Sequence, residues 1–558
     1  MKQALIAALA FVLCACAQNQ TQQSAGVEQN RLQAHIEFLA SDSLRGRDTG
    51  TRGYQIAAEY VAAEFQALGL APAGDEGSFF QAVPMSERSL VRGSAVAQIN
   101  RSSGAVALDF PAQFTMGPDW HNPQRSVTAD TVFVGYGIVA PDFDHDDYAG
   151  LDVDGKIVVL LGGRPQSWPT EEGAHLSSGL EKARHAAERG AVGMVVLHTP
   201  RMEQVFPWED GLKYLDVPGM GWVGKDGLPD GYFPALKAAA YFNLDAGAML
   251  FEGAPTSLDD IFTADSEEQP IAGFPLQAGV TLERKSSYRQ LESPNVVALI
   301  EGSDPVLRDE VVIFTAHLDH LGVITNEDGV EEIYNGALDN AAGVAILLET
   351  ARVLSAERDT LKRSVMFLVV TGEEKGLLGA GYFAKNPTVP IENIVANINL
   401  DMPLLVYPFA DVVAFGAEHS TLKDYVDRAA QGAGVTLSPD PMPEQGLFIR
   451  SDHYRLVQQG VPAVFLVTGF QSRDPDINGQ EVFMTHLKEH YHQPSDDVNL
   501  PIDYASGAVF TEININIARE VANNPQRPLW NADSFFGRTF GRPESLADPA
   551  VADQVGEQ

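Results

Sequence analysis

Cysteine is nearly absent from this chain. Its 558 residues include two, Cys14 and Cys16, and both lie close to the start. With no cysteine after residue 16, the rest of the chain has no disulfide framework, no cysteine-bound zinc site and no thiol nucleophile. The nucleophile elbow G-x-S-x-G is missing as well. These absences exclude the thiol hydrolases and the serine hydrolases built on that elbow.

Basic residues are also scarce. Lys and Arg total 38 against 75 Asp and Glu, which gives a formal net charge of −37. A nucleic-acid partner requires a basic surface, so this balance argues against one. The acidic excess is typical of a soluble exported protein. A hydrophobic content of 45% favours a globular fold, and the length allows two or three domains.

The first 16 residues have the pattern of an export signal. One Lys is followed by an apolar run too short for an ordinary membrane helix, and then by small residues. The run Leu13-Cys14-Ala15-Cys16 resembles a bacterial lipobox, with Leu three positions before Cys16 and Ala directly before it. We therefore expect lipid attachment at Cys16, a polar tether over residues 17–29, and anchoring to the bacterial envelope. The alternative is a simple secretory signal and a secreted protein.

The pattern of residues along the chain changes twice. Residues 30–70 contain two amphipathic helical patterns, and residues 91–285 read as short strands rich in Gly and Pro. From Asn295 onward, apolar strands alternate with helices, the mark of a sheet covered on both faces. The predicted fold class is α/β, with a mixed, mostly parallel sheet flanked by helices. For the C-terminal tail at 526–558 we make no prediction of fold.

Six acidic and imidazole side chains follow strand-like segments in the C-terminal half. They are His317, Asp339, Glu373, Glu374, Asp401 and His492. The ends of parallel strands meet in a crevice at one edge of an α/β sheet, so we expect these side chains to converge. Five nitrogen and oxygen ligands with one spare carboxylate suit two metal ions and a base, as metal-assisted hydrolysis requires. Taken singly, Asp339 could instead be a helix N-cap.

The motifs around these residues resemble those of the di-zinc aminopeptidases of peptidase family M28. The run from A-H-L-D-H to Y-H-Q-P-S-D-D carries the ligand order of that family, and D-S-L-R-G-R-D-T-G-T-R-G-Y resembles its N-terminal helices. V-F-V-G-Y-G-I-V-A-P resembles part of a protease-associated (PA) domain. The resemblance implies a peptidase domain formed by residues 30–90 and 286–525, interrupted by a PA-like domain at 91–285.

The same resemblance implies two zinc ions per chain. His317 and Asp401 would hold one, Glu374 and His492 the other, and Asp339 would bridge them. The ligand types would also accept cobalt or manganese.

Catalytic roles follow from the resemblance too. Glu373 would be the general base on a bridging water, and Tyr491 would stabilise the oxyanion. Asp319 would hold the second ring nitrogen of His317 through its carboxylate. The implied activity is removal of N-terminal residues from peptides.

Alternative functions remain open at this point. The same metal site supports a carboxypeptidase acting on acidic dipeptides, and an enzyme like glutaminyl cyclase would use one zinc. A peptide-binding lipoprotein could hold zinc without catalysis, although such a site needs no base at Glu373. The oligomeric state is not predicted.

Two further motifs have other interpretations. Residues 219–226, G-M-G-W-V-G-K-D, match G-x-G-x-x-G in form but lack the following helix and the Ser or Thr of a P-loop, so we expect no nucleotide site. In R-S-D-H-Y-R, Ser451 or Asp452 would be a helix N-cap, or this segment would line the substrate cleft.

Overall fold

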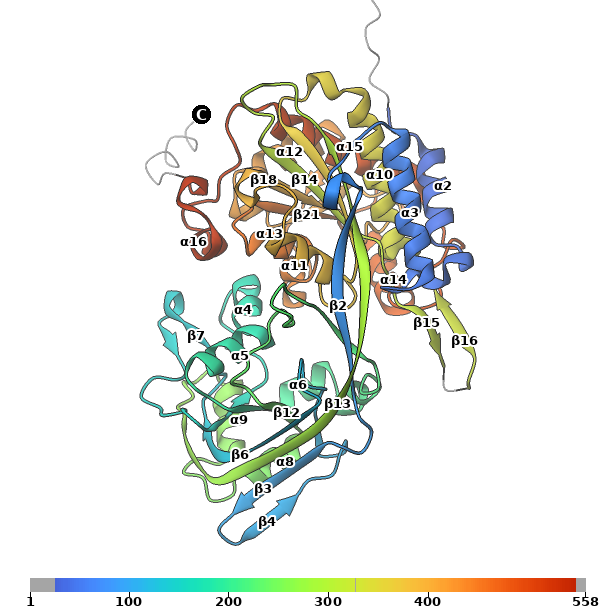
Figure 1. Cartoon of the computed structure of the whole chain (residues 1–558). Helices are drawn as coiled ribbons and strands as arrows, with labels where there is room; N and C mark the ends of the chain where they lie inside the picture. The colour runs from blue at the N-terminus through green and yellow to red at the C-terminus, as the bar shows by residue number, and fades with distance from the viewer. Residues whose placement is uncertain (1–25, 327, 548–558) are drawn as a thin grey trace, which may run out of the picture.

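The computed structural model describes residues 26–326 and 328–547. Figure 1 shows two lobes, which we call the upper lobe (residues 26–90 and 286–547) and the lower lobe (residues 91–285). The predicted export signal, Cys16 and residues 548–558 lie outside the described residues. Within the described ranges, no helix combines the length and the apolar character that crossing a membrane would require.

The upper lobe contains a mixed sheet whose centre is parallel. Four parallel strands pair in the order β17–β14–β18–β21 and are buried along their whole length. Their bounds are β14 Val311–His317, β17 Ser364–Val370, β18 Ile394–Asn399 and β21 Ala463–Thr468. At one side β19 (Asp411–Phe415) runs antiparallel to β21 and pairs in parallel with β20 (Thr436–Leu437). At the other side β13 (Phe274–Ile300) runs antiparallel to β17 and pairs with β1 (Ala71–Pro72).

Helices cover both faces of this sheet. Alternate strand residues such as Phe314 and Phe367 share one apolar core with the larger set of helices. That set is α2 Gln29–Leu39, α3 Arg52–Ala67, α10 Ala342–Ala356, α12 Leu422–Gly432 and α15 Tyr504–Asn523. The strand residues that alternate with this first set, such as Ile313 and Leu368, point to the other face and pack against α11 (Leu378–Lys385) and α13 (His453–Val457). The predicted α/β class with a mixed, mostly parallel sheet is confirmed.

The lower lobe is built on a second sheet. Its strands pair in the order β4–β3–β13–β6–β9–β10–β12–β5, with β6, β9, β10 and β12 parallel. The bounds are β3 Val96–Arg101, β4 Gly104–Ala107, β5 Phe114–Thr115, β6 Gln124–Phe133, β9 Ile157–Leu161, β10 Gly193–Leu197 and β12 Ala238–Phe242. The short hairpin of β7 (Val139–Ala140) and β8 (His145–Asp146) lies apart from it. The helices are α4 Thr170–Leu176, α5 Gly179–Glu188, α6 Pro200–Val205, α7 Trp208–Leu212, α8 Leu244–Leu250 and α9 Leu258–Ser266.

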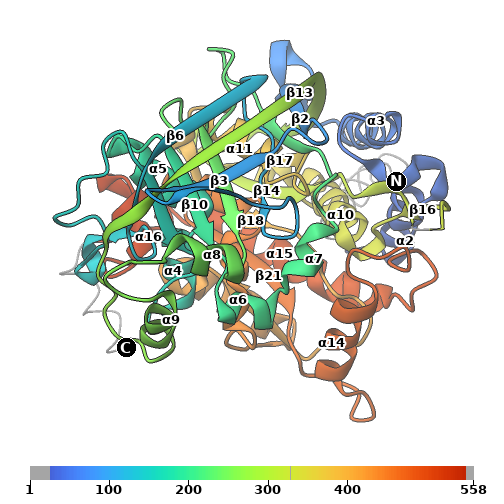
Figure 2. The same cartoon turned by 90° about the horizontal axis from the view of Figure 1, so that it is seen from below.

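A long two-stranded ribbon joins the lobes. β13 is 27 residues long and runs through both sheets, beside β6 in the lower lobe and β2 (Phe80–Leu90) above (Figure 2). Its partner changes at Ser286, which pairs with Leu90, whereas residues 279–285 pair with β6. The short strand β11 (Gly219–Trp222) returns from the lower lobe to pair with β2. The limits of the inserted domain and its PA character stay predictions.

Residues 526–547, for which no fold was predicted either way, pack against the rest of the chain. Trp530 is fully buried, and α16 (Phe535–Phe540) follows it. Phe536 packs on His419 and Phe448 of the upper lobe, at ring-centroid distances of 4.9 Å to each. This segment therefore closes one side of the molecule, near α4 of the lower lobe.

Candidate metal centre

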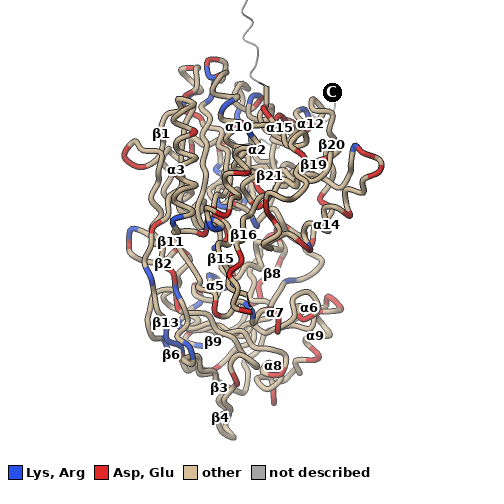
Figure 3. The backbone as a smooth tube through the Cα atoms, turned by 90° about the vertical axis from the view of Figure 1, so that its right-hand side faces the viewer, with Lys and Arg blue, Asp and Glu red and all other residues tan. Residues whose placement is uncertain are grey.

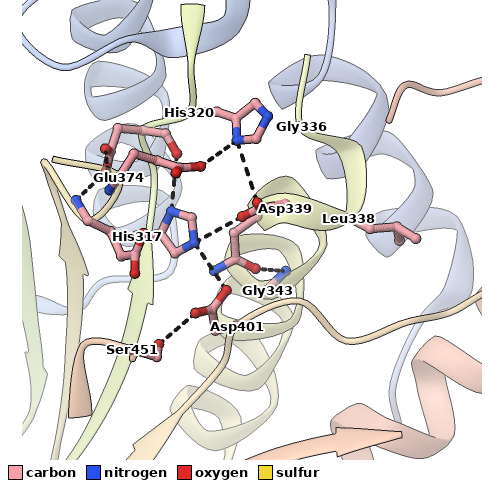
Figure 4. Close-up of polar contacts among 12 residues, drawn as sticks. His317, His320, Gly336, Leu338, Asp339, Gly343, Glu374, Asp401 and Ser451 are labelled. Carbon is pink, nitrogen blue, oxygen red and sulfur yellow. Dashed lines mark hydrogen bonds and ion pairs between the residues drawn. The ribbon is translucent and has the colours of Figure 1, made fainter. Parts of the chain in front are cut away.

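Three of the predicted residues come together because their strands are parallel neighbours. His317 is the last residue of β14, Glu373 lies three residues beyond the end of β17, and Asp401 lies two beyond the end of β18. Parallel strands present their carboxyl ends at one edge of the sheet. Figure 4 shows His317 and Asp401 facing each other at this edge, with Asp339 beside them.

The first group of donors is formed by His317, Asp339 and Asp401. His317 Nε2 lies 3.1 Å from Asp401 Oδ1 and 3.2 Å from Asp339 Oδ1. All three side chains are buried or nearly so, and together they could hold one metal ion. Asp339 sits in the turn before α10 and makes no N-cap bond, because Asn340 accepts from the Gly343 amide instead. The N-cap interpretation of Asp339 is therefore wrong.

The second group uses the other oxygen of Asp339. His492 Nε2 lies 3.2 Å from Asp339 Oδ2 and 3.3 Å from Glu374 Oε2. His320 Nδ1 approaches the same carboxylates, at 2.8 Å from Glu374 Oε1 and 3.8 Å from Asp339 Oδ2. Burial alone would raise the pKa of Glu374, but the hydrogen bonds from His320 and His492 lower it to about 2. Asp339 thus directs one oxygen to each group of donors, as a bridging carboxylate does.

These donor sets suit zinc. Imidazole nitrogen and carboxylate oxygen are ordinary zinc ligands, and two atoms bound to one tetrahedral ion lie about 3.3 Å apart. The observed separations of 3.1–3.3 Å around His317 and His492 agree with that spacing. The residues present therefore fit two ions with Asp339 between them.

Asp319 supports the centre differently from the prediction. The second ring nitrogen of His317, Nδ1, contacts the backbone carbonyl of Asp319 at 3.1 Å, not its carboxylate. The carboxylate accepts hydrogen bonds from the amides of Glu373 and Glu374 at 3.1 and 3.3 Å, and from Thr49 at 3.1 Å. The predicted acceptor atom was wrong because the chain turns directly after His317. Because Nδ1 of His317 contacts the Asp319 carbonyl, Nε2 of His317 faces Asp339 and Asp401. The Asp319 carboxylate orients the loop that carries Glu373.

Glu373 has the surroundings of a base. Among the described residues, the Glu373 carboxylate forms no ion pair with His317 or His492. Burial, reinforced by the charges of Asp401 and Asp452, raises the pKa of Glu373 well above its usual value, although His317 opposes the shift. A carboxylate with a raised pKa can accept and return a proton near neutral pH.

A pocket of about 450 Å³ opens beside Glu373. Its metal-side wall contains His317, Asp339, Asp401 and Tyr491. Most of its remaining lining is apolar, and three further lining residues are charged and exposed. The apolar lining consists of Met402, Leu404, Met442, Leu447, Phe465, Val467, Phe483, Met484 and Leu487, and the exposed charged residues are Glu444, Arg450 and Lys488.

Several supporting residues were missed or left undecided by the sequence. Ser451 donates to Asp401 Oδ2 at 2.6 Å and accepts from Asn399 at 2.7 Å, so it orients a ligand and is not an N-cap. Asp496 accepts from the amides of Leu338 and Asp339 at 2.9 and 3.0 Å. The motif H-Q-P-S-D-D contained Asp496, but nothing in the sequence pairs it with a turn 157 residues away.

Arg47 explains part of the N-terminal motif. Its fully buried guanidinium donates to the backbone carbonyls of Leu39, Leu318, Asn335 and Gly336. These carbonyls belong to the end of α2, the segment after β14 and the turn before α10. Arg47 therefore ties together the two segments that carry His317 and Asp339.

The other histidines near His492 lie apart from the donor groups. His490 contacts Ser495 at 2.9 Å, and His486 is buried beside it. The run 219–224 is not a nucleotide loop, since Gly219–Trp222 forms β11, paired with β2.

Residues 295–518, which carry all the donors above, match the model of peptidase family M28. Among curated proteins, the chain is 35% identical over 108 residues to a probable zinc metalloprotease of Leptosphaeria maculans, covering 19% of this chain and 24% of that protein. It is 29% identical over 257 residues to aminopeptidase Y of Saccharomyces cerevisiae, covering 44% and 40%. The chain thus spans less than half the length of these curated relatives.

A solved structure is similar over a larger share of the chain. The aminopeptidase from Aneurinibacillus sp. strain AM-1 aligns with a TM-score of 0.49 and 20% identity, covering 91% of this chain and 96% of that one. The match of residues 295–518 to the family model agrees with the resemblance to family M28 that the motifs indicated.

Proposed function

We propose that this chain is an exported di-zinc aminopeptidase that removes N-terminal residues from peptides. The observation that carries the proposal is the split of one carboxylate, Asp339, between two donor groups, the first of which lines a pocket together with Glu373. The names of two relatives, a zinc metalloprotease and an aminopeptidase, support the metal and the reaction.

In this proposal the donors divide as the resemblance implies. His317 and Asp401 would hold one zinc, Glu374 and His492 the other, and Asp339 would join them. His320, bonded to Glu374 Oε1, would fix the orientation of that ligand. Zinc bound there would supply a Lewis acid for the scissile carbonyl and would lower the pKa of an attacking water.

Glu373 would move the proton of the reaction. It would take a proton from the attacking water and deliver it to the leaving amine. Asp319 holds the loop of Glu373 through two amide hydrogen bonds, so that the carboxylate keeps its place while it changes protonation. Replacing Glu373 by Gln should lower kcat by roughly 10²–10⁴-fold.

Tyr491 would act on the other side of the reacting carbonyl. It lines the pocket and stacks on His492 at a ring-centroid distance of 3.8 Å. Burial raises the pKa of Tyr491, so its hydroxyl keeps its proton and can donate to the developing oxyanion. The loss of this donor in Tyr491→Phe should cost roughly 10²–10³-fold in kcat, as for other oxyanion donors.

The pocket favours a large apolar side chain at the peptide N-terminus. Its apolar lining is formed by Met, Leu, Val and Phe side chains. The exposed Arg450 and Lys488 in the lining could instead capture a carboxylate, and for this reason the experiment below also tests the carboxypeptidase alternative.

The first experiment is hydrolysis of aminoacyl-p-nitroanilides and of N-blocked peptides by a chain that begins at residue 17. Chelator-sensitive release from leucyl and phenylalanyl substrates, lost in Glu373→Gln while two zinc ions stay bound, is the expected result. Cleavage confined to N-blocked peptides with a free C-terminus would replace the proposal by the carboxypeptidase. If the metal is retained and neither set of substrates is hydrolysed, the remaining alternative is a peptide-binding lipoprotein that holds zinc without catalysis.

The lipid anchor at Cys16 is a separate proposal. It would place the enzyme at the bacterial envelope, on the end of the tether at residues 17–29. Metabolic labelling with a fatty-acid analogue should mark the full-length protein and should not mark Cys16→Ser. A labelled Cys16→Ser variant would contradict attachment at this residue.

A further inference from the structure

A second large pocket lies between the two lobes, away from the apolar pocket of the metal centre. It has a volume of about 530 Å³. We call it the interlobe pocket. It is bounded by β11 and α5 on the lower-lobe side and by Lys375, Gly376, Leu378 and Arg455 on the upper-lobe side. None of its lining residues belongs to the donor groups described above.

The lining of the interlobe pocket is basic in an otherwise acidic protein. Arg88, Arg284, Lys375 and Arg455 line it, against the two carboxylates Asp119 and Asp230. The whole chain carries a formal charge of −37, so a surplus of cations in one cavity stands out. Basic residues lie along the β2–β13 ribbon in Figure 3.

Three of these cations already have partners. Arg284 pairs with Asp119 at 2.8 Å, Lys375 pairs with Asp48 at 3.1 Å, and Arg455 donates to the carbonyl of Gly376 at 3.1 Å. Arg88 differs from them. Among the described residues its guanidinium makes neither an ion pair nor a hydrogen bond, whereas Arg455, which also has no ion pair, donates two hydrogen bonds.

The side chain of Arg88 is held in place by the residues that pack around it. It is 9% exposed, and its guanidinium stacks over the ring of Trp120 at 3.2 Å from the centroid. The backbone of β11 lies against it, since a Cβ on Gly219 would be 3.1 Å from Nε and a Cβ on Gly221 would be 3.3 Å from Nη1. The glycines of the G-x-G-x-x-G run thus make room for an arginine. Burial lowers the pKa of Arg88 to about 10, which leaves it charged at neutral pH.

The remaining walls are apolar and aromatic. They include Leu180, Met194, Met220, Trp222, Phe233 and Leu236. A ligand that fits must therefore combine one negative group with an apolar body. The nearby charges of Asp119 and Asp230 disfavour a dianionic phosphate, whereas a monoanionic carboxylate can be matched by the guanidinium of Arg88.

We propose that the interlobe pocket binds the carboxylate of an amino acid with a large apolar side chain, through Arg88. This chemistry is presented by a free amino acid and by the C-terminal residue of a peptide. The inference does not rest on the proposed peptidase activity, because it concerns binding at residues outside the metal centre.

Binding of N-acetyl-phenylalanine, measured by calorimetry with the chain that begins at residue 17, tests this proposal. The expected result is one site per chain, with at least tenfold weaker binding of N-acetyl-phenylalaninamide, which lacks the carboxylate. Acetyl-Ala-Ala-Phe is the second arm. Binding of both acids shows that a peptide C-terminus is accepted, and binding of the single amino acid alone identifies the free form.

The variants separate this site from the metal centre. Arg88→Gln should weaken binding at least tenfold, whereas Arg289→Gln, on the same ribbon but exposed and paired with Glu87, should leave it unchanged. Leu180→Trp, which fills the pocket from the lower lobe, should also weaken binding and tests the site if Arg88→Gln does not fold. Equal binding of acid and amide, binding unchanged in both pocket variants, or loss of binding when zinc is chelated would overturn the proposal. Failure of the peptidase assay would leave these measurements unaffected.

Discussion

At the scale of single residues, the arrangement of the candidate donors depends on side chains outside the two donor groups. Ser451 is one of them, because its hydroxyl fixes the outer oxygen of Asp401. Removal of such a partner commonly lowers metal affinity by roughly 10–100-fold. We expect that loss in Ser451→Ala, measured by zinc competition with a chromogenic chelator. Ser506→Ala, a buried serine on α15 bonded to Tyr407 and Asp503, is the control and should retain normal affinity.

A buried histidine makes stability depend on pH. His453 is fully buried between the rings of Phe448 and Phe465, and burial lowers its pKa to about 3. The unfolded chain binds a proton below its ordinary pKa of 6.5 while the folded chain does not, so this residue destabilises the fold as the pH falls from 6.5 towards 3. At pH 5 the cost is about 2 kcal/mol.

His453→Phe, which cannot be protonated, should therefore lose less stability than the parent between pH 7 and pH 5. Chemical denaturation at the two pH values measures this difference. Equal losses in the parent and the variant would show that His453 does not contribute to the pH dependence.

The limits of sequence reasoning are clearest at this scale. His317, Glu373 and Asp401 could be placed together because each follows an apolar strand and strand ends converge. Ser451, Asp496 and His320 could not be assigned in the same way, because their partners lie 50, 157 and 54 residues away across turns whose geometry no periodicity encodes. The acceptor for His317 Nδ1 depended on one backbone turn and was mispredicted for that reason.

At the scale of elements, Arg47 joins the end of α2 to the segments that follow β14 and precede α10. A lysine cannot satisfy the four carbonyls that the guanidinium bonds, and buried carbonyls left unpaired cost about 1–3 kcal/mol each. We expect Arg47→Lys to destabilise the protein by about 3 kcal/mol and to weaken zinc retention. Thermal unfolding and metal content measure the two effects. Arg45→Lys, at an exposed pair with Glu331, should change neither.

Element-level prediction succeeded where strands were apolar and helices amphipathic, which covers the central sheet and the helices on its faces. It offered no prediction for residues 526–547, whose structure depends on contacts of Trp530, Phe535 and Phe536 with distant parts of the chain. It also gave no partner for β11, since a strand of four residues can pair with many others.

At the scale of the whole molecule, the lower lobe is expected to restrict access to the metal centre. Leu90 and Ser286 are paired neighbours on the ribbon, so residues 91–285 can be replaced by a short turn. We expect this variant to show an altered ratio of kcat/KM between long and short peptides, or to lose activity. Kinetics unchanged on both classes of substrate would contradict a role of the lower lobe in access.

The ribbon has one more consequence. Between β2 and β13 the chain leaves the upper lobe and returns, and the two strands pair along all 11 residues of β2. A protease that cuts the exposed segment around Val205 and Tyr214 would produce two fragments, each of which keeps one strand of the ribbon. The nicked protein should elute as one species under native conditions and separate into two bands in detergent. The same property makes this segment a place to divide the gene into halves whose products reassemble.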